Sequence, residues 1–259
     1  MIIRELQISL SIGSLFTSSW TPQDLRSAIP ILLLHDSLGS VELWRDFPEQ
    51  LADSTRRTVI AYDRLGYGKS DANPELPDDN VVESESETVA QLLDALDIER
   101  CIVFGHSIGG EMAVACAARL PGRVSAVVAE SAQCWLEEQT LAAIRAGRAQ
   151  FDDPEQMQRL RKYHGDKAQW VLDAWAATWL RPSMRNWSIL PEAARVRCPL
   201  LTIHGDNDGF TSVDQPRKLA EAVAGPSRVE IIAGCGHIPH REQPERVLSI
   251  LAGFMRGID

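Results

Sequence analysis

The sequence has no apolar run long enough to cross a membrane, although 44% of its residues are hydrophobic. Its N-terminus also lacks a basic start, an uninterrupted apolar stretch and a small-residue cleavage site, the three parts of a secretory signal. We therefore predict a protein without a membrane segment that resides in the cytoplasm.

Positive charge is scarce: 26 Lys and Arg residues stand against 36 Asp and Glu residues, giving a formal net charge of −10 at pH 7. Nucleic-acid binding relies on clustered Lys and Arg, so this balance argues against a nucleic-acid partner. The five cysteines are an odd number and form no C-x-x-C pair, and we expect reduced, buried thiols.

What the sequence does contain is an alternation of two patterns. Short runs rich in Val, Ile and Leu, typical of strands buried inside a parallel sheet, end at His35, Asp63, His106, Ser131, Asp206 and Gly236. Helical patterns separate them, over residues 42–53, 83–96, 110–120, 213–224 and 244–255. This order predicts an α/β fold with a doubly wound, mostly parallel sheet and active-site residues at the carboxyl ends of its strands.

The alternation breaks once, between residues 135 and 197, where helical patterns dominate. We predict a helical cap inserted at residues 135–197, with residues 1–134 and 198–259 forming the core. Five of the seven tryptophans lie in this insertion, and most are expected to pack the cap onto the core. Candidates for lining an apolar substrate pocket are Trp135, Trp175 and Trp179.

Residues 105–109 read GHSIG and match the pattern G-x-S-x-G. The strand pattern CIVF precedes the motif and a helical pattern follows it, which is the setting of a nucleophile on a tight strand-to-helix turn. Such a turn needs neighbours without bulk, and Gly105 and Gly109 meet that need. We predict that Ser107 is a nucleophile; a serine that merely caps the helix is the simpler alternative.

A serine hydroxyl is a weak nucleophile near neutral pH, so Ser107 requires a base and a group that orients the base. Both are expected in loops after later strands. His237 follows the last strand pattern and is the predicted base, with His240, at the entry to the last helix, as its competitor. Asp206 and Asp208 follow the preceding strand, and both are candidates for the orienting acid.

The order of serine, aspartate and histidine resembles the α/β-hydrolase superfamily over nearly the whole chain. In that family the acid usually ends a G-x-x-D segment after this strand, and Gly205 to Asp208 fits, so the resemblance favours Asp208 and leaves Asp206 as a turn-former. The resemblance implies a catalytic triad of Ser107, Asp208 and His237, on an α/β-hydrolase fold with an eight-stranded sheet and an inserted helical cap.

The segment HDSLGS, residues 35–40, resembles the H-G-x-x-G segment of the same family. This implies an oxyanion hole formed by the backbone N–H groups of Ser37 and Ile108. The chain departs from the family pattern at Asp36, where glycine is customary. A carboxylate beside a developing anion is unfavourable, so we expect Asp36 to point away from it.

The segment YDRLGYGKSD ends in GKS, as a phosphate-binding P-loop does. Asp63 stands where that motif needs its first glycine, and no helical pattern follows, so a nucleotide site is not expected. The segment instead resembles the D-x-x-G-x-G-x-S turn of α/β-hydrolases. Glu111, one turn after Ser107, is expected to pair with an arginine such as Arg64.

These observations predict a carboxylesterase-like serine hydrolase that cleaves an ester, lactone or thioester of a small, apolar acyl group through an acyl-enzyme. A small-molecule substrate and neither metal nor organic cofactor are expected. A carbon–carbon bond hydrolase or a cofactor-free haloperoxidase on the same triad is an alternative, and a non-catalytic protein that binds a small ligand is another. The physiological substrate and the oligomeric state stay open.

Overall fold

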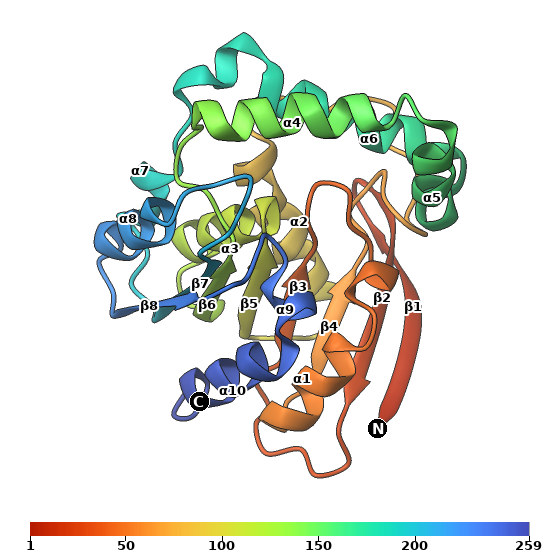
Figure 1. Cartoon of the computed structure of the whole chain (residues 1–259). Helices are drawn as coiled ribbons and strands as arrows, with labels where there is room; N and C mark the ends of the chain where they lie inside the picture. Colours follow the sequence, from red (N-terminus) through yellow and green to blue (C-terminus); the bar gives the residue numbers. More distant parts are fainter. Residues whose placement is uncertain (259) are drawn as a thin grey trace.

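One eight-stranded sheet organises residues 1–258, the part of the chain that the computed structural model describes (Figure 1). The strands are β1 Ile2–Leu10, β2 Gly13–Thr21, β3 Ile31–Leu34, β4 Val59–Tyr62, β5 Cys101–His106, β6 Val124–Glu130, β7 Leu200–Gly205 and β8 Ser227–Ile232. Their order is β1-β2-β4-β3-β5-β6-β7-β8. β2 pairs antiparallel with β1 and β4, and the remaining pairings are parallel. The predicted fold class is confirmed.

The helices that join the strands cover both faces of the sheet (Figure 1). α2 (Val81–Ala95), α3 (Ile108–Arg119) and α8 (Asp214–Ala222) contribute to one cluster of buried apolar side chains. α1 (Phe47–Thr55) and α10 (Pro244–Phe254) contribute to a second cluster, which is separate from the first. Each face of the sheet is therefore shielded, as its continuous apolar strands require.

The helix predicted over residues 42–53 is in fact two elements. A 3-10 turn, η1 (Val41–Trp44), comes first, and α1 begins only at Phe47. Arg45 separates them because its φ of 54° is left-handed and cannot continue a right-handed helix. The side chains of Trp44 and Phe47 are buried on either side of this break, so tertiary packing favours it.

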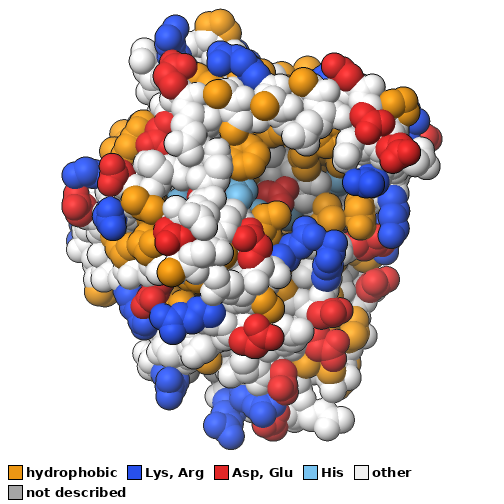
Figure 2. Space-filling model, viewed as in Figure 1, with side chains coloured by type: hydrophobic (Ala, Val, Ile, Leu, Met, Phe, Trp, Pro, Cys, Tyr) orange, Lys and Arg blue, Asp and Glu red, His pale blue; other side chains and the backbone are white. Residues whose placement is uncertain are grey.

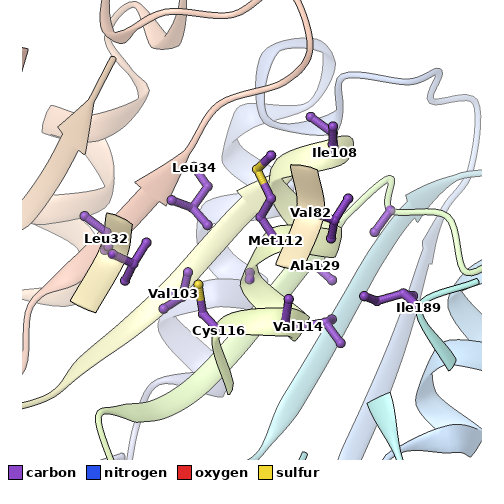
Figure 3. Packing of buried hydrophobic residues seen from close by; sticks show 14 of the residues in the cluster. Leu32, Leu34, Val82, Val103, Ile108, Met112, Val114, Cys116, Ala129 and Ile189 are labelled. Atoms are coloured by element: carbon purple, nitrogen blue, oxygen red, sulfur yellow. The ribbon is translucent and has the colours of Figure 1, made fainter. Parts of the chain in front are cut away.

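The helix that follows the predicted nucleophile is anchored by one apolar face. Ile108, Met112 and Cys116 lie four residues apart on α3, and their side chains enter the same cluster as Leu34 of the sheet and Val82 of α2 (Figure 3). Burying an apolar side chain of the size of isoleucine or methionine contributes about 1.5–3 kcal/mol. This face fixes the N-terminus of α3, and with it the turn that carries Ser107.

The connection between β6 and β7 is helical, and we call residues 135–197 within it the cap segment. It contains α4 (Glu138–Gln150), α5 (Pro154–His164), η2 (Gly165–Lys167), α6 (Ala168–Leu180), η3 (Pro182–Asn186) and α7 (Leu190–Ala193). α4 contacts α6, whereas α7 packs against α3 and α8. The division of the chain into a core and a cap at these residues stays a prediction.

Among residues 1–258, no helix has both the length and the apolar character needed to cross a membrane. The five cysteines are free thiols, four of them buried and Cys198 half-buried.

Candidate active site

Ser107 occupies the turn between β5 and α3 with φ 55° and ψ −127°, a conformation that few residues adopt. The flanking glycines leave no space for a side chain. A Cβ on Gly105 would lie 1.8 Å from the carbonyl oxygen of Gly109, and a Cβ on Gly109 would lie 2.1 Å from the carbonyl oxygen of Leu34. The Ser107 N–H donates to the carbonyl oxygen of Glu130 at 2.8 Å, which fastens the turn to β6.

The structure brings Ser107, Asp208 and His237 together from three loops. His237 Nδ1 donates to Asp208 Oδ2 at 2.8 Å, and His237 Nε2 lies 3.2 Å from Ser107 Oγ. Because the carboxylate can only accept, the Nδ1 atom carries the proton, and Nε2 of the neutral ring is left to accept from the serine hydroxyl. This is the geometry of a nucleophile, a base and an acid that orients the base.

Asp208 is held by further contacts. Its Oδ1 accepts from the N–H groups of Phe210 at 2.7 Å and Thr211 at 3.3 Å, and its Oδ2 accepts from the Thr211 hydroxyl at 3.2 Å. Burial alone would raise the pKa of Asp208, but the hydrogen bond and charge of His237 and the Phe210 N–H lower it below its ordinary value. The carboxylate is therefore ionised and holds the imidazole in one tautomer.

The two competing candidates lie apart from this contact. Asp206 is exposed, and its Oδ1 accepts from the Gly234 N–H at 2.7 Å, which closes a turn. His240 is buried in α9 (Pro239–Glu242), where its backbone N–H and its ring Nδ1 both donate to the carboxylate of Glu130. Within residues 1–258, neither side chain bonds to Ser107.

Ser37 and Ile108, the residues predicted to form an oxyanion hole, border the same space as Ser107. Ser37 lies in the wall of the cavity described below, on a loop whose Asp36 carbonyl accepts from His35 Nδ1 and Arg64 Nη2, each at 2.8 Å. Ile108 is the first residue of α3, where a helix offers no internal acceptor for the N–H. Their role as oxyanion donors stays a prediction.

Sequence reasoning missed His106, although it stands inside the G-H-S-I-G motif. Its Nδ1 lies 3.3 Å from Asp36 Oδ2, and its Nε2 lies 2.8 Å from the carbonyl oxygen of His237. The other oxygen of Asp36 accepts from the Leu38 N–H at 2.8 Å. The carboxylate that departs from the family pattern thus faces a histidine and a backbone donor. The departure at Asp36 was the available signal, because a carboxylate removed in part from water favours a polar partner.

A cavity of about 310 Å³ opens beside Ser107. In Figure 2, histidine and hydrophobic side chains are visible in the hollow beneath the helices of the cap segment. Of the three tryptophans proposed for a pocket, Trp175 and Trp179 line this cavity. Trp135 is not in its wall, and its backbone pairs with Ser188 in an isolated bridge. Apolar walls come mainly from Leu38, Leu43, Trp44, Ile144, Phe210 and Ile238.

Four buried side chains in this wall have a polar atom without a hydrogen-bond partner within the described residues. The atoms are Ser40 Oγ, Trp44 Nε1, Ser131 Oγ and Gln133 Oε1. Ser131 directly follows β6 and has a left-handed φ of 51°. A buried polar atom without a partner is costly, so a hydrogen bond between a ligand group and any of these atoms would be stabilising.

Glu111 does not pair with Arg64 as expected. Its Oε1 accepts from the backbone N–H of Gln133 at 3.1 Å, while Arg64 donates to the Asp36 carbonyl. Burial raises the pKa of Glu111 to about 8, so its side chain is mainly protonated at neutral pH.

One atom each of His106, Glu130 and His240, of the kind that can bind a metal ion, lies within 4.8 Å of the other two. Protein partners already engage these residues: Glu130 accepts from His240, and the ring of His106 faces Asp36 and the His237 carbonyl. We interpret the cluster as a hydrogen-bonded network behind the triad and assign no metal to it.

The fold and this site define a class of protein. Residues 31–250 match the model of the Alpha/beta hydrolase family, and the chain therefore belongs to that family. This membership supports hydrolase activity.

Individual relatives agree with the family. The chain is 24% identical over 258 residues to the 2-hydroxy-6-oxo-2,4-heptadienoate hydrolase of Pseudomonas putida, covering 91% of this chain and 92% of that protein. It is 39% identical over 99 residues to a Mycobacterium phage D29 protein provisionally named a non-heme haloperoxidase, but this match spans only 38% of the chain and 34% of that protein. The solved enol-lactonase of Burkholderia xenovorans LB400 superposes with a TM-score of 0.73 at 22% identity, covering 98% of this chain and 100% of that one.

Proposed function

We propose that this protein is a serine hydrolase that cleaves an ester, lactone or thioester of a small acyl group through an acyl-enzyme. The observation that carries the proposal is the contact of His237 with both Ser107, at 3.2 Å, and Asp208, at 2.8 Å, beside a cavity. Each residue has the partner that its role requires.

In the proposed reaction, Ser107 Oγ attacks the carbonyl carbon while His237 Nε2 takes its proton. The backbone N–H groups of Ser37 and Ile108 bind the developing oxyanion, and each such donor is typically worth about 10²- to 10³-fold in rate. His237 then protonates the leaving group, Asp208 stabilises the imidazolium, and a water molecule activated by His237 releases the acyl group.

The cavity wall supports a mainly apolar acyl group that carries one hydrogen-bonding function. Trp175, Trp179 and Ile144 come from the cap segment, which we propose forms the roof of the pocket. The unpartnered atoms of Ser131 and Gln133 would hold the polar function. A small-molecule substrate of this kind fits a volume of about 310 Å³.

Labelling with a fluorophosphonate probe tests the proposal. The wild-type protein should be modified at Ser107, and Ser107→Ala should not react. With p-nitrophenyl butyrate, Ser107→Ala and His237→Ala should lower kcat by roughly 10⁴- to 10⁶-fold, and Asp208→Asn by roughly 10³- to 10⁴-fold.

Asp206→Asn is the matched control for Asp208→Asn, because Asp206 lies two residues away and its contact with the Gly234 N–H needs only an acceptor. It should retain wild-type turnover. Equal turnover of the ester by wild type and His237→Ala would refute the mechanism. Absence of labelling would favour a protein that only binds a small ligand.

A carbon–carbon bond hydrolase on the same triad is the second candidate, because the relative named a 2-hydroxy-6-oxo-2,4-heptadienoate hydrolase, whose named substrate is a carbon-chain oxo acid, aligns over nearly its full length. A panel of esters, lactones, thioesters and vinylogous diketones separates the two. Turnover of the diketones alone would assign the carbon–carbon reaction.

A further inference from the structure

His106 lies within the site but outside the triad. It ends β5, directly before Ser107, and only 2% of it is exposed to solvent. One ring nitrogen, Nδ1, lies 3.3 Å from Asp36 Oδ2, and the other, Nε2, lies 2.8 Å from the carbonyl oxygen of His237. A single imidazole therefore reaches two loops that are distant in sequence.

Both partners of this ring can only accept hydrogen bonds. A carboxylate and a backbone carbonyl have no proton to donate, so satisfying both requires an N–H on each ring nitrogen. A neutral imidazole has one N–H and would leave either Asp36 or the His237 carbonyl facing a lone pair. The hydrogen bond at Nε2 and the ion-pair distance at Nδ1 thus favour the doubly protonated, positively charged form of His106.

We propose that protonated His106 is a positioning residue that ties together the loop of Ser37, the turn of Ser107 and the loop of His237. Asp36 precedes Ser37, and His106 precedes Ser107. The bridge therefore sets the three catalytic segments relative to one another. This role rests on the proposed hydrolase function.

The groups that face His106 keep it charged. They are Asp36 from the loop after β3, Glu130 at the end of β6, His237 with ring centroids 5.2 Å apart, and His240 of α9 at 5.0 Å. Burial alone would lower the pKa of His106, but Asp36, Glu130 and the His237 carbonyl raise it to about 8. Burial lowers the pKa of His240, which therefore adds no competing positive charge at neutral pH.

Loss of the proton on His106 should therefore impair catalysis. As the pH rises through about 8, the ring loses one proton and keeps a single N–H. It can then donate to only one of its two partners, Asp36 or the His237 carbonyl, and the loop of the other partner is released. The free-enzyme profile of kcat/KM against pH should show a fall with a midpoint near 8.

Asp36→Asn gives the decisive test. An asparagine amide can donate to Nδ1 of a neutral ring while Nε2–H still donates to the His237 carbonyl, so the bridge persists without charge. This variant should keep kcat/KM within about tenfold of wild type near pH 7 and should lose the fall near pH 8. His106→Phe removes both contacts and should lower kcat/KM by more than tenfold at every pH, also without that fall.

Two controls isolate the group that titrates. His164 also braces the Ser37 loop, because its Nε2 donates to the Leu38 carbonyl at 3.0 Å and its Nδ1 accepts from the Gly68 N–H at 2.9 Å, a neutral arrangement. His164→Asn should keep the fall near pH 8. Glu111→Gln should keep it too, which separates His106 from the other buried group with a pKa of about 8.

A direct readout does not depend on activity or on the stability of any variant. In ¹⁵N NMR spectra of wild type, both ring nitrogens of His106 should be protonated near pH 7. Detection of a neutral ring there would overturn the proposal, as would an Asp36→Asn profile that keeps the wild-type fall. Failure of fluorophosphonate labelling would instead overturn the hydrolase assignment, so the two failures are distinguishable.

Discussion

At Gly109, the backbone of α3 passes so close to β3 that an added Cβ would lie 2.1 Å from the carbonyl oxygen of Leu34. Gly109→Ala must therefore push α3 away from the sheet, and this moves the turn that carries Ser107. We expect a loss of roughly 1–3 kcal/mol in the free energy of unfolding and at least a tenfold loss in kcat/KM. Thermal unfolding and ester turnover measure the two effects.

Gly209→Ala is the matched control. Nothing lies within 4 Å of a Cβ at that position, and its φ is not left-handed. Like Gly109→Ala, this substitution lowers the conformational entropy of the unfolded chain, but it introduces no clash. The free energy of unfolding should therefore be unchanged or slightly raised. Wild-type stability and turnover in Gly109→Ala would contradict the steric account of the G-x-S-x-G turn.

At the scale of elements, α4 and α6 pack so closely that the ring of Trp175 leaves no space for a side chain on Gly147. An added Cβ on Gly147 would lie 2.7 Å from Cη2 of that ring, on a side chain that also lines the cavity. Gly147→Ala should shift Trp175 toward the cavity. We expect the kcat/KM ratio of p-nitrophenyl hexanoate to acetate to fall about tenfold, the scale of one or two methylene groups in a pocket.

Gly253→Ala in α10 serves as the control for this change, because the nearest atom to an added Cβ is the tip of Arg256 at 3.7 Å. Both substitutions gain about 1 kcal/mol of helix propensity. Only Gly147→Ala should change the preference for chain length. An unchanged ratio would show that Trp175 does not limit the pocket.

The local elements were largely predictable from sequence, because apolar runs and helical periodicity are properties of neighbouring residues. All six predicted strands occur, as β3 to β8. The break at Arg45 was not predicted, because packing of Trp44 and Phe47 favours its left-handed φ. The bridge between Trp135 and Ser188 was not predicted for a similar reason, because the neighbours of Trp135 in sequence do not reveal its distant partner.

In the candidate site, too, features set by neighbouring residues were predictable from sequence, and contacts between distant residues were not. The glycine spacing around Ser107 and the position of His237 after the last strand are readable from sequence, and the structure brings both to one contact. The partners of His106 and Glu111 are not readable, because each contact joins residues from different strands or loops. Family resemblance supplied the choice of Asp208 over Asp206, which local pattern left open.

Over the whole molecule, ionisable groups with shifted pKa values set how stability varies with pH. Asp36 and Asp208 have pKa values below the ordinary 3.8, so they contribute stability above that pH and lose it as the pH falls through their folded values. His106 and Glu111 have pKa values of about 8, above their ordinary 6.5 and 4.5, so the folded state binds more protons between these limits. Burial lowers the pKa of His35, His164, His204 and His240, which opposes this trend below their ordinary value of 6.5. Stability should therefore decline as the pH rises from about 7 to about 9.

Glu111→Gln isolates the larger part of this decline. The folded protein holds Glu111 protonated until about pH 8, whereas the unfolded chain releases that proton near 4.5. The free energy of unfolding therefore falls as the pH rises through this interval. Glutamine keeps an oxygen for the Gln133 N–H and cannot ionise. The melting temperatures of variant and wild type should be similar near pH 5, and the variant should be higher by several °C near pH 9. Glu87→Gln, at an exposed position of α2, should follow the wild-type curve. Parallel curves for Glu111→Gln and wild type would mean that Glu111 is ionised in the folded protein.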